Sequence, residues 1–292
     1  LLPGVELTVI AGRRSEAIAR CHPAIDRVLT FDRHPLRLLP FLARLRDRTF
    51  DAWLDPKEHF SRNHATLARI AKARIKVGFN RRPGGPFDRA VVAPVDPTTH
   101  FTKMMLAPLD LLGIPWESPP PLSLGLPAES VARADRMLQR RALLEVLVNI
   151  SAGMPARYWQ EGKWGDLLSR VAGIRPARFW LSSSPEDAVL ADRIVAVAGT
   201  QGAEISRLPP GSLLDVAAVV QRVDVVISMD TSIVHLASVY DRPIVGLYTT
   251  PEPNFSRFRP LSRVQEVIQG ERIGDIPVHS VAIAYERLLA RL

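Results

Sequence analysis

With 292 residues, 47% of them hydrophobic and 23% charged, the chain has the composition of an ordinary soluble globular protein and the length for two domains with separate cores. Asp and Arg interrupt the longest apolar runs, so no stretch reaches the roughly 20 residues that a membrane-spanning helix needs. The single cysteine, Cys21, excludes an intrachain disulfide framework and suits a reducing compartment.

The chain is basic, with 38 Lys and Arg against 30 Asp and Glu and a formal net charge of +8 at pH 7. This excess favours an anionic partner: a nucleotide diphosphate, a phosphorylated glycolipid, an anionic membrane surface or nucleic acid. Nucleic acid is the least favoured of these, because the basic residues are spread along the chain and form no dense block. Charge alone does not choose among the others.

Short β-rich runs alternate with longer helical ones, which is typical of an α/β fold. In the first half we expect strands over residues 6–11, 27–31, 52–55 and 76–79, and helices over 15–20, 35–48, 61–73 and 100–112. Gly113 and Pro115 stop the last of these helices.

Prolines and glycines crowd residues 115–127, and this density marks a linker between domains of residues 1–120 and 121–292. In the second domain we expect strands over 145–150, 177–181 and 203–208, the last at a sheet edge. The helices are expected over 127–141, 185–198, 212–222 and 278–292, with 165–171 inside another.

The most informative segment is 223–249, where a buried-strand run to Met229 meets Asp230, Thr231 and Ser232 before a short apolar helix to Tyr240. An Asp-Arg-Pro turn and a strand over 244–248 follow. We expect Asp230 to cap the helix, whose free amides and dipole would then face the end of the strand. Thr231 and His235 are four residues apart and share a helix face. The pattern suits a diphosphate, and it suits an ordinary βαβ unit with a good cap equally well.

This segment resembles the signature of the heptosyltransferase family, bacterial enzymes that add heptose from ADP-heptose to the lipopolysaccharide core. The family pattern is a hydrophobic strand, Asp-Thr-Gly, two residues, His-Leu-Ala, a short helix, Lys-Pro and a strand that ends in a Gly- or Pro-bearing loop. Ser232 stands where Gly is usual, Arg242 stands where Lys is common, and residues 250–253 continue the loop. The matching positions are Asp230, Thr231, His235, Leu236, Ala237 and Pro243.

The resemblance implies a GT-B fold, which is two Rossmann-like domains with the active site in the cleft between them. Residues 1–120 would take the acceptor, and residues 121–292, with a closing helix, would bind the donor. The implied partners are a nucleotide-diphosphate sugar and an anionic glycolipid, with no nucleic acid, cofactor or metal. The resemblance further implies a monomer in the cytoplasm, in peripheral contact with the inner face of the inner membrane.

The family's chains begin with a strand and a Gly-Asp loop whose Asp is the proposed general base. Residues 1–10 here resemble the family's second strand instead. We therefore expect the first βα unit, roughly 25 residues in a typical unit, to be missing. No catalytic base is assigned for this reason.

Donor-binding residues follow from the resemblance. Residues 149–153, with Ser151 and Gly153, are similar to a His-Pro-Gly-Ala-Gly stretch, and small residues there let backbone amides approach phosphate. Arg157 stands where the family has a phosphate-contacting Lys, and its guanidinium keeps that role. Glu186 is our choice for holding the ribose. A plain βα turn and an acid in a first helical turn are the alternatives. The donor set is Asp230, Thr231, Ser232, His235, Arg157, Ser151, Gly153 and Glu186.

Acceptor-binding candidates lie after the strand expected over 52–55. Lys57, His59 and Arg62 are suited to acceptor phosphates, and Arg81 and Arg82 could add to them, with a solvated loop as the alternative. The seven histidines show no ligand pair at helical spacing. Two rivals to the heptose reading stay open: a transferase of the same fold that uses another nucleotide sugar, and a non-catalytic nucleotide-sugar-binding relative.

Overall fold

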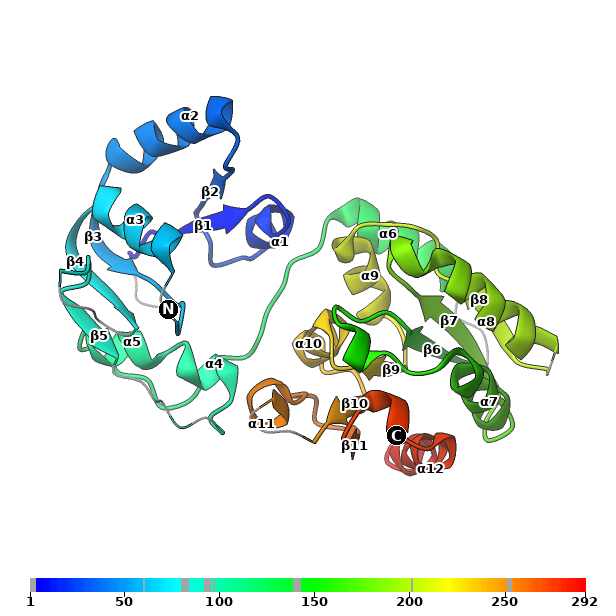
Figure 1. Ribbon diagram of the computed structural model, residues 1–292. Helices are drawn as coiled ribbons and strands as arrows, with labels where there is room; N and C mark the ends of the chain where they lie inside the picture. The colour runs from blue at the N-terminus through cyan, green and yellow to red at the C-terminus, as the bar shows by residue number, and fades with distance from the viewer. Residues whose placement is uncertain are drawn as a thin grey trace. The chain divides into compact units, whose positions relative to one another are not determined.

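The computed structural model describes residues 4–59, 61–79, 84–91, 96, 98–138, 143–200, 202–250 and 254–292. The chain forms two compact units, Leu1–Pro121 and Leu122–Leu292, hereafter unit 1 and unit 2 (Figure 1). The boundary falls inside the proline-rich segment over 115–127. In the described part of the chain, no helix combines the length and the apolar character needed to cross a bilayer.

Unit 2 is built on one continuous parallel sheet with the strand order β11-β10-β9-β6-β7-β8 (Figure 1). Val, Ile, Leu and Phe dominate its central strands because both faces of the sheet are covered. The strands are β6 (Leu144–Asn149), β7 (Ala177–Ser182), β8 (Glu204–Arg207), β9 (Val225–Met229), β10 (Ile244–Thr249) and β11 (Gln265–Gly270).

Two helical layers cover this sheet. Val146 and Val148 point into a core with α7 (Glu161–Ala172), α8 (Ala188–Thr200) and α12 (Val278–Leu289). Leu147, one residue out of phase, points into a second core on the other face. That second core includes residues of α6 (Ala128–Met137), α9 (Leu213–Val220) and α10 (Ser232–Val239).

The strand order reverses direction between β6 and β9. From β6 the chain proceeds outward through β7 to β8, and from β9 it proceeds the other way through β10 to β11. The carboxyl ends of two strands that diverge in this way leave a crevice between their loops, which is where open α/β sheets bind ligands. The segment over 223–249 therefore enters the sheet at its switch point.

Unit 1 is also parallel, but its strands form two separate sheets, β1-β2 and β3-β4-β5. Its core is small: Phe41 and Leu45 of α2 pack with Leu67 of α3 and Ala71 against partly buried side chains from β1, β2 and β3. The strands are β1 (Thr8–Gly12), β2 (Arg27–Phe31), β3 (Thr49–Leu54), β4 (Lys72–Phe79) and β5 (Arg89–Val91). The longer helices are α2 (Pro35–Arg46) and α3 (Arg62–Ile70), with α1 (Glu16–Arg20) following β1.

The α/β class and the parallel sheets agree with the sequence-based expectation, but the helix expected over 100–112 is wrong. Two short helices take its place, α4 (Phe101–Met104) and α5 (Ala107–Asp110). Pro108 falls in the first turn of α5, where its missing N–H costs nothing, whereas it would break a continuous helix.

Candidate functional site

The candidate site lies at the carboxyl ends of β6 and β9, at the switch point of unit 2. Thr231 is the N-cap of α10: its backbone is extended, with φ −147° and ψ 179°, and its Oγ1 accepts from the N–H of Ile233 at 3.3 Å. The first amides of α10 are therefore presented beyond the end of β9, where a helix attracts anions.

The prediction that Asp230 caps this helix is wrong. Asp230 lies between the last residue of β9, Met229, and the cap, Thr231, and its backbone N–H donates to the carbonyl of Leu247 in β10 at 3.0 Å. Its carboxylate, 4% exposed, is held instead by the guanidinium of Arg157 at 3.2 Å and the amide of Asn254 at 2.7 Å.

Arg157, Asp230 and Asn254 form a closed set of polar contacts. Nη2 of Arg157 donates to Oδ1 of Asn254 at 3.1 Å, and Nη1 also donates to the backbone carbonyl of Asp230 at 3.3 Å. Arg157 comes from the short 3-10 helix Pro155–Arg157 after β6, and Asn254 opens α11 (Asn254–Phe258). The three side chains thus tie the loops after β6, β9 and β10 together.

Asn149, the last residue of β6, joins the same loops from below the surface. It is 4% exposed, and its Nδ2 lies within donating distance of Ser151 O (3.0 Å), Ser228 Oγ (3.2 Å) and Thr231 Oγ1 (3.2 Å). It therefore positions the hydroxyl that caps α10. Sequence reasoning assigned no role to Asn149 or Asn254, although a polar residue directly after the apolar run Val146–Val148 is a signal that could have identified Asn149.

The remaining donor-side candidates differ in their surroundings. Oγ of Ser151 accepts from the N–H of Ser184 at 2.7 Å and so links the loops after β6 and β7. Gly153 and Ser232 are exposed, and a Cβ on Gly153 would meet no atom within 4 Å. Glu186 is exposed in the short helix Pro185–Asp187.

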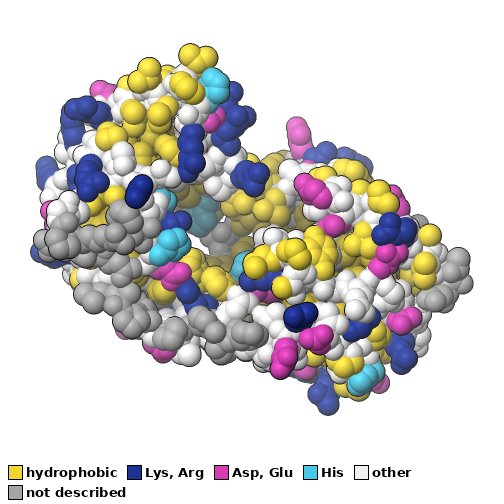
Figure 2. All heavy atoms as spheres, in the orientation of Figure 1, with side chains coloured by type: hydrophobic (Ala, Val, Ile, Leu, Met, Phe, Trp, Pro, Cys, Tyr) yellow, Lys and Arg dark blue, Asp and Glu magenta, His cyan; other side chains and the backbone are white. Residues whose placement is uncertain are grey.

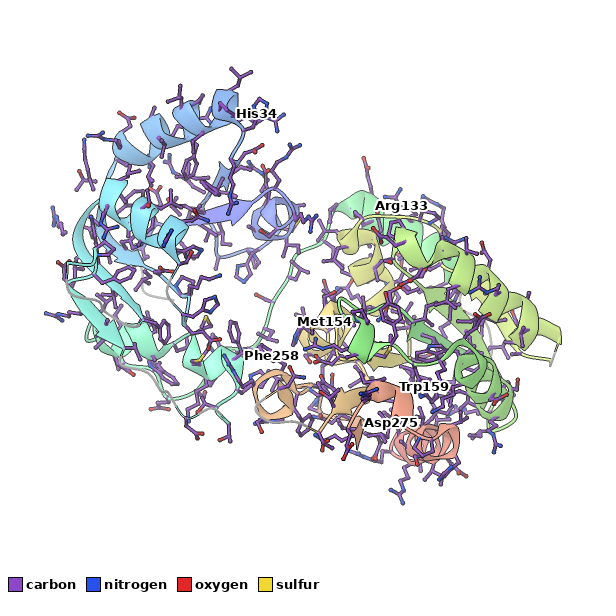
Figure 3. All side chains as sticks on the ribbon, viewed as in Figure 1. His34, Arg133, Met154, Trp159, Phe258 and Asp275 are labelled. Atoms are coloured by element: carbon purple, nitrogen blue, oxygen red, sulfur yellow. The ribbon has the colours of Figure 1, made fainter. Side chains whose placement is uncertain are left out.

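His235 is half-buried on α10, its ring 6.3 Å from that of Phe258 at an interplanar angle of 65° (Phe258 is labelled in Figure 3). Burial lowers the pKa of His235 below its usual 6.5, and the nearby charge of Asp230 opposes the shift only in part. The imidazole is therefore neutral at pH 7, and it contributes no positive charge to an anion site there.

Trp159 is a core residue: it is 2% exposed and packs edge-on against Trp164, with ring centroids 4.8 Å apart (Figure 3). Its indole N–H donates to the carbonyl of Ile276 at 2.9 Å. The loop between Asn149 and Trp159 is thus anchored at both ends, which holds Arg157 in place.

The acceptor-side candidates lie after β3 in unit 1. A buried carboxylate, Asp55, organises their loop: its Oδ1 accepts from the backbone N–H of Lys57 at 3.1 Å and is 2.8 Å from Nδ1 of His64. Lys57 is half-buried, while His59 and Arg62 are exposed. Arg81, Arg82 and residues 251–253 lie outside the described residues.

Two broader features bear on ligands. On the face shown in Figure 2, Lys and Arg are scattered among acidic and apolar side chains. Within the described ranges, no three His, Cys, Asp or Glu side chains are placed to share a metal ion.

Comparison with known proteins places the fold. A curated relative, the lipopolysaccharide core heptosyltransferase OpsX of Haemophilus influenzae, is 22% identical over 273 residues, covering 91% of this chain and 76% of that protein. A glycosyltransferase family 9 structure from Veillonella parvula superposes with a TM-score of 0.80 at 16% identity, covering 98% of this chain and 89% of that one.

The structure of E. coli heptosyltransferase WaaC with ADP gives a TM-score of 0.75 at 20% identity, over 98% of this chain and 91% of that one. The fold is accordingly GT-B, with two Rossmann-like domains. Residues 39–279 match the profile described as glycosyltransferase family 9 (heptosyltransferase). That match spans most of the chain, which therefore belongs to glycosyltransferase family 9, the heptosyltransferase family.

Proposed function

We propose that this glycosyltransferase moves heptose from ADP-heptose to a saccharide of the lipopolysaccharide core. The observation that carries the proposal is the placement of Arg157 beside the N-terminus of α10 at the switch point of unit 2. A fixed guanidinium and a helix N-terminus are together suited to a diphosphate. Support for the sugar comes from the relatives, one named as a heptosyltransferase of the lipopolysaccharide core and one solved with ADP.

In the proposed reaction a base removes the proton of an acceptor hydroxyl. The oxygen then bonds to the anomeric carbon of the donor while the bond from that carbon to the diphosphate breaks, and ADP leaves with the electron pair. Arg157 and the first amides of α10 would stabilise the charge that grows on the leaving diphosphate, without a metal ion. We assign the base to none of the described residues.

The other donor-side candidates each take a role in the proposed site. Ser151, Gly153, Thr231, Ser232 and His235 would line the donor, and exposed Glu186 would hold the ribose. Beside it, Asp187 Oδ2 accepts from the hydroxyl of Tyr158 at 2.8 Å and from that of Ser184 at 3.2 Å.

On the acceptor side, Lys57, His59 and Arg62 would meet an anionic glycolipid. We further propose that the enzyme is a monomer at the cytoplasmic side of the membrane, in peripheral contact with it. Asp55 holds the loop that carries Lys57 and His59, and it contacts His64 of α3, the helix that begins at Arg62.

The test is ADP binding by calorimetry in wild type and in Arg157→Gln. Loss of charge-assisted hydrogen bonds worth about 1.5–3 kcal/mol predicts roughly 10- to 100-fold weaker ADP binding. Adenosine, which carries no phosphate, should bind both proteins alike. Arg287→Gln is the matched control, because it removes the same charge from exposed α12, away from the site. Equal losses for ADP and adenosine would place Arg157 away from the phosphates.

A donor screen separates the rival functions. Turnover with ADP-heptose supports the proposal, whereas turnover of a UDP-sugar alone would assign another donor. Ser232 motivates this second candidate, because it replaces the family's Gly at the exposed start of α10. ADP binding without turnover of any nucleotide sugar would favour a non-catalytic binding protein.

A further inference from the structure

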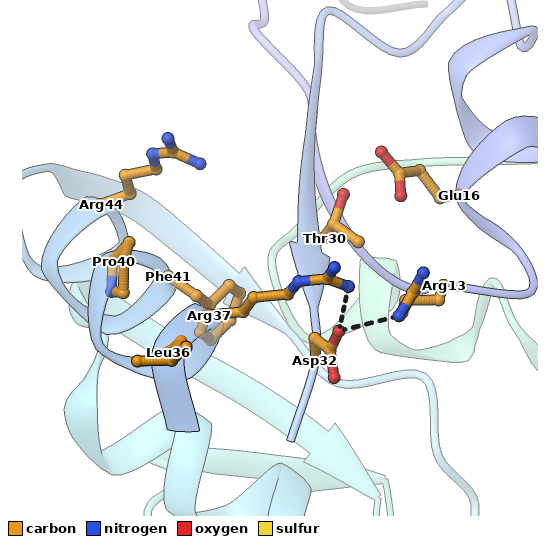
Figure 4. Close-up of a pocket in the computed structure, with 9 residues that line it drawn as sticks. All are labelled: Arg13, Glu16, Thr30, Asp32, Leu36, Arg37, Pro40, Phe41 and Arg44. Carbon is orange, nitrogen blue, oxygen red and sulfur yellow. Dashed lines mark hydrogen bonds and ion pairs between the residues drawn. The ribbon is translucent and has the colours of Figure 1, made fainter. Parts of the chain in front are cut away.

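Unit 1 contains a pocket of about 380 Å³ at the carboxyl ends of β1 and β2 (Figure 4). Its volume is within the range of small-molecule sites, about 300–1,000 Å³. Its walls come from the turn after β1, α1, β2 and α2. None of its lining residues belongs to the donor or acceptor candidates, so it is a separate feature of unit 1.

Arginines dominate the charge of this pocket. Arg13 and Arg37 converge on Asp32, at 3.5 Å and 2.9 Å from its Oδ2 (Figure 4). The Asp32 side chain is 15% exposed and also accepts from the backbone N–H of His34 at 3.0 Å. That N–H and the guanidinium of Arg37 hold the pKa of Asp32 below its usual value, so Asp32 is ionised at pH 7. Its one negative charge faces the two positive charges of Arg13 and Arg37.

The other charges of the pocket leave an excess of positive charge. Glu16 is paired with Arg20, one turn along α1, at 2.6 Å. Arg44 brings a third guanidinium from α2. Each guanidinium carries five N–H donors, and a contact with Asp32 uses few of them. The pocket therefore keeps donors and positive charge for an anion.

One wall of the pocket is apolar. Phe41, 3% exposed, closes the floor, and Leu36 and Pro40 of α2 line the side. Leu36 is 80% exposed, so it stands at the rim. α2 also carries Arg37 and Arg44, while the carboxylates, the hydroxyl of Thr30 and the guanidinium of Arg13 come from the other elements of the pocket. Such a mixture of polar groups and apolar surface is suited to a ring that has a C–H face and hydroxyl groups.

We propose that this pocket binds a sugar that carries an anionic group, a phosphate or a carboxylate. Arg13 and Arg37, which meet at Asp32, hold the anion, while Arg44, set apart from them beyond Pro40, donates to the sugar beside the apolar wall of α2, which contacts the ring (Figure 4). If the bound sugar is part of the acceptor, this inference rests on the proposed function. The pocket would then contact the acceptor at a second place on unit 1, apart from the loop after β3. Its affinity for an anionic sugar does not depend on the donor.

The test is a titration of the full chain with glucose 6-phosphate, glucuronate, glucose and inorganic phosphate, followed by calorimetry or ligand-detected NMR. All titrations use Arg157→Gln as the background, because this variant weakens the donor site and leaves the pocket intact. Arg44→Gln and Arg46→Gln are the matched pair: both remove one arginine from the last turn of α2, and only Arg44 lines the pocket.

We expect the two anionic sugars to bind more tightly than glucose and inorganic phosphate. Arg44→Gln should weaken their binding at least about tenfold, while Arg46→Gln leaves it unchanged. No binding of either anionic sugar at millimolar concentration, or equal losses in the two variants, would overturn the proposal. Inorganic phosphate that binds as tightly as glucose 6-phosphate would overturn the assignment to a saccharide.

ADP titrations of wild type and of the single variant Arg44→Gln separate this inference from the proposed function. If the pocket binds no anionic sugar while ADP binds normally, the pocket proposal fails alone. If wild type does not bind ADP while glucose 6-phosphate still depends on Arg44, the donor assignment fails and the pocket stands.

Discussion

The two units place polar side chains at the carboxyl ends of parallel strands, but they support them differently. In unit 2, Asn149 ends β6 and Asp230 directly follows β9; both strands have a neighbour on each side, and both residues are 4% exposed. In unit 1, the strand before Lys57 and His59 pairs only with β4 among the described residues. Asp55 of unit 1 is buried as well, at 6% exposure, so the two units differ in how the preceding strand is supported and not in the burial of the carboxylate.

Burial along single strands shows the same contrast. Every residue of β9 is buried, whereas Thr49, Asp51, Ala52 and Leu54 of β3 are exposed, Leu54 by 41%. Removing apolar surface from water is the main stabilising contribution to folding. We expect unit 2 to resist unfolding more than unit 1, and its site to be more nearly preformed.

The largest expected effect comes from Glu145→Ala in unit 2. Glu145, 6% exposed, accepts from the indole of Trp180 at 2.6 Å and lies 3.6 Å from the guanidinium of Arg178, itself 6% exposed. Arg178 keeps its contact with Glu204 at 2.7 Å, so the change leaves its buried charge only partly compensated and the indole N–H of Trp180 without its acceptor. We expect a cost of about 3 kcal/mol, the lower end for a broken buried ion pair. Denaturant unfolding measures this loss, and hydrogen exchange should locate it in the peptides of unit 2.

Asp51→Ala is the control, because Asp51 pairs with Arg74 on the surface of unit 1 with side chains 89% and 78% exposed. Such a pair contributes little, so its removal should leave the midpoint unchanged. If Glu145→Ala raised hydrogen exchange in unit 1 as much as in unit 2, the two units would not differ in the way inferred.

A smaller effect is expected from Asp55→Ala, which tests the corresponding carboxylate of unit 1. Asp55 is buried, and its Oδ1 contacts the N–H of Lys57 and the ring of His64. Leaving these partners unsatisfied should cost about 1–3 kcal/mol in unfolding experiments. Exchange should rise in peptides of α3 and of the loop after β3, and a loss as large as that of Glu145→Ala would break the comparison.

The sequence predicts strands in both units, including β2 of unit 1 over 27–31, and it fails where a strand has few apolar residues or is very short. The strand runs over 177–181 and 244–248 agree with β7 and β10 within one residue, because strands buried on both faces are nearly continuous apolar runs. β11, with the polar sequence Gln-Glu-Val-Ile-Gln-Gly, and the three-residue β5 carry no such signal and were missed.

Site geometry is harder to predict than strands. By residue type Asp230 is at least as good a cap as Thr231, and only the backbone geometry, in which Thr231 Oγ1 accepts from the N–H of Ile233, identifies Thr231 as the cap. Asn149 meets Thr231 across 82 residues, and Asn254 meets Arg157 across 97. Contacts over such separations leave no local pattern, so these partners emerge only from the fold.

Asn149→Ala tests whether the buried contacts of unit 2 preform the donor site. Without the amide, the hydroxyl that caps α10 loses a donor, at about 0.5–1.5 kcal/mol for one hydrogen bond, which predicts roughly 2- to 10-fold weaker ADP binding. Calorimetry measures the change. Ser169→Ala, which removes a hydroxyl bonded within α7, is the control. Unchanged ADP affinity in Asn149→Ala would mean that the cap does not depend on this amide.

The smallest expected effect is a pH dependence from His235. Because its pKa is lower in the folded chain than the usual 6.5, the unfolded chain binds the proton more readily, and the free energy of unfolding falls as the pH drops below about 6.5. The slope from this one group is at most about 1.4 kcal/mol per pH unit, and it ends below the folded pKa. Unfolding midpoints at pH 7.5, 6.5 and 5.5 should therefore decline less in His235→Gln than in wild type.

His279→Gln gives the comparison for that slope, since His279 is exposed on α12 and its removal should leave the wild-type pH dependence intact. The carboxylates titrate in all three proteins, so only the difference between the variants reports on His235. Parallel curves for wild type and His235→Gln would mean that the α10 imidazole is as hydrated as an exposed one. The greater burial of residues in unit 2 than in unit 1 would then not extend to His235 on α10.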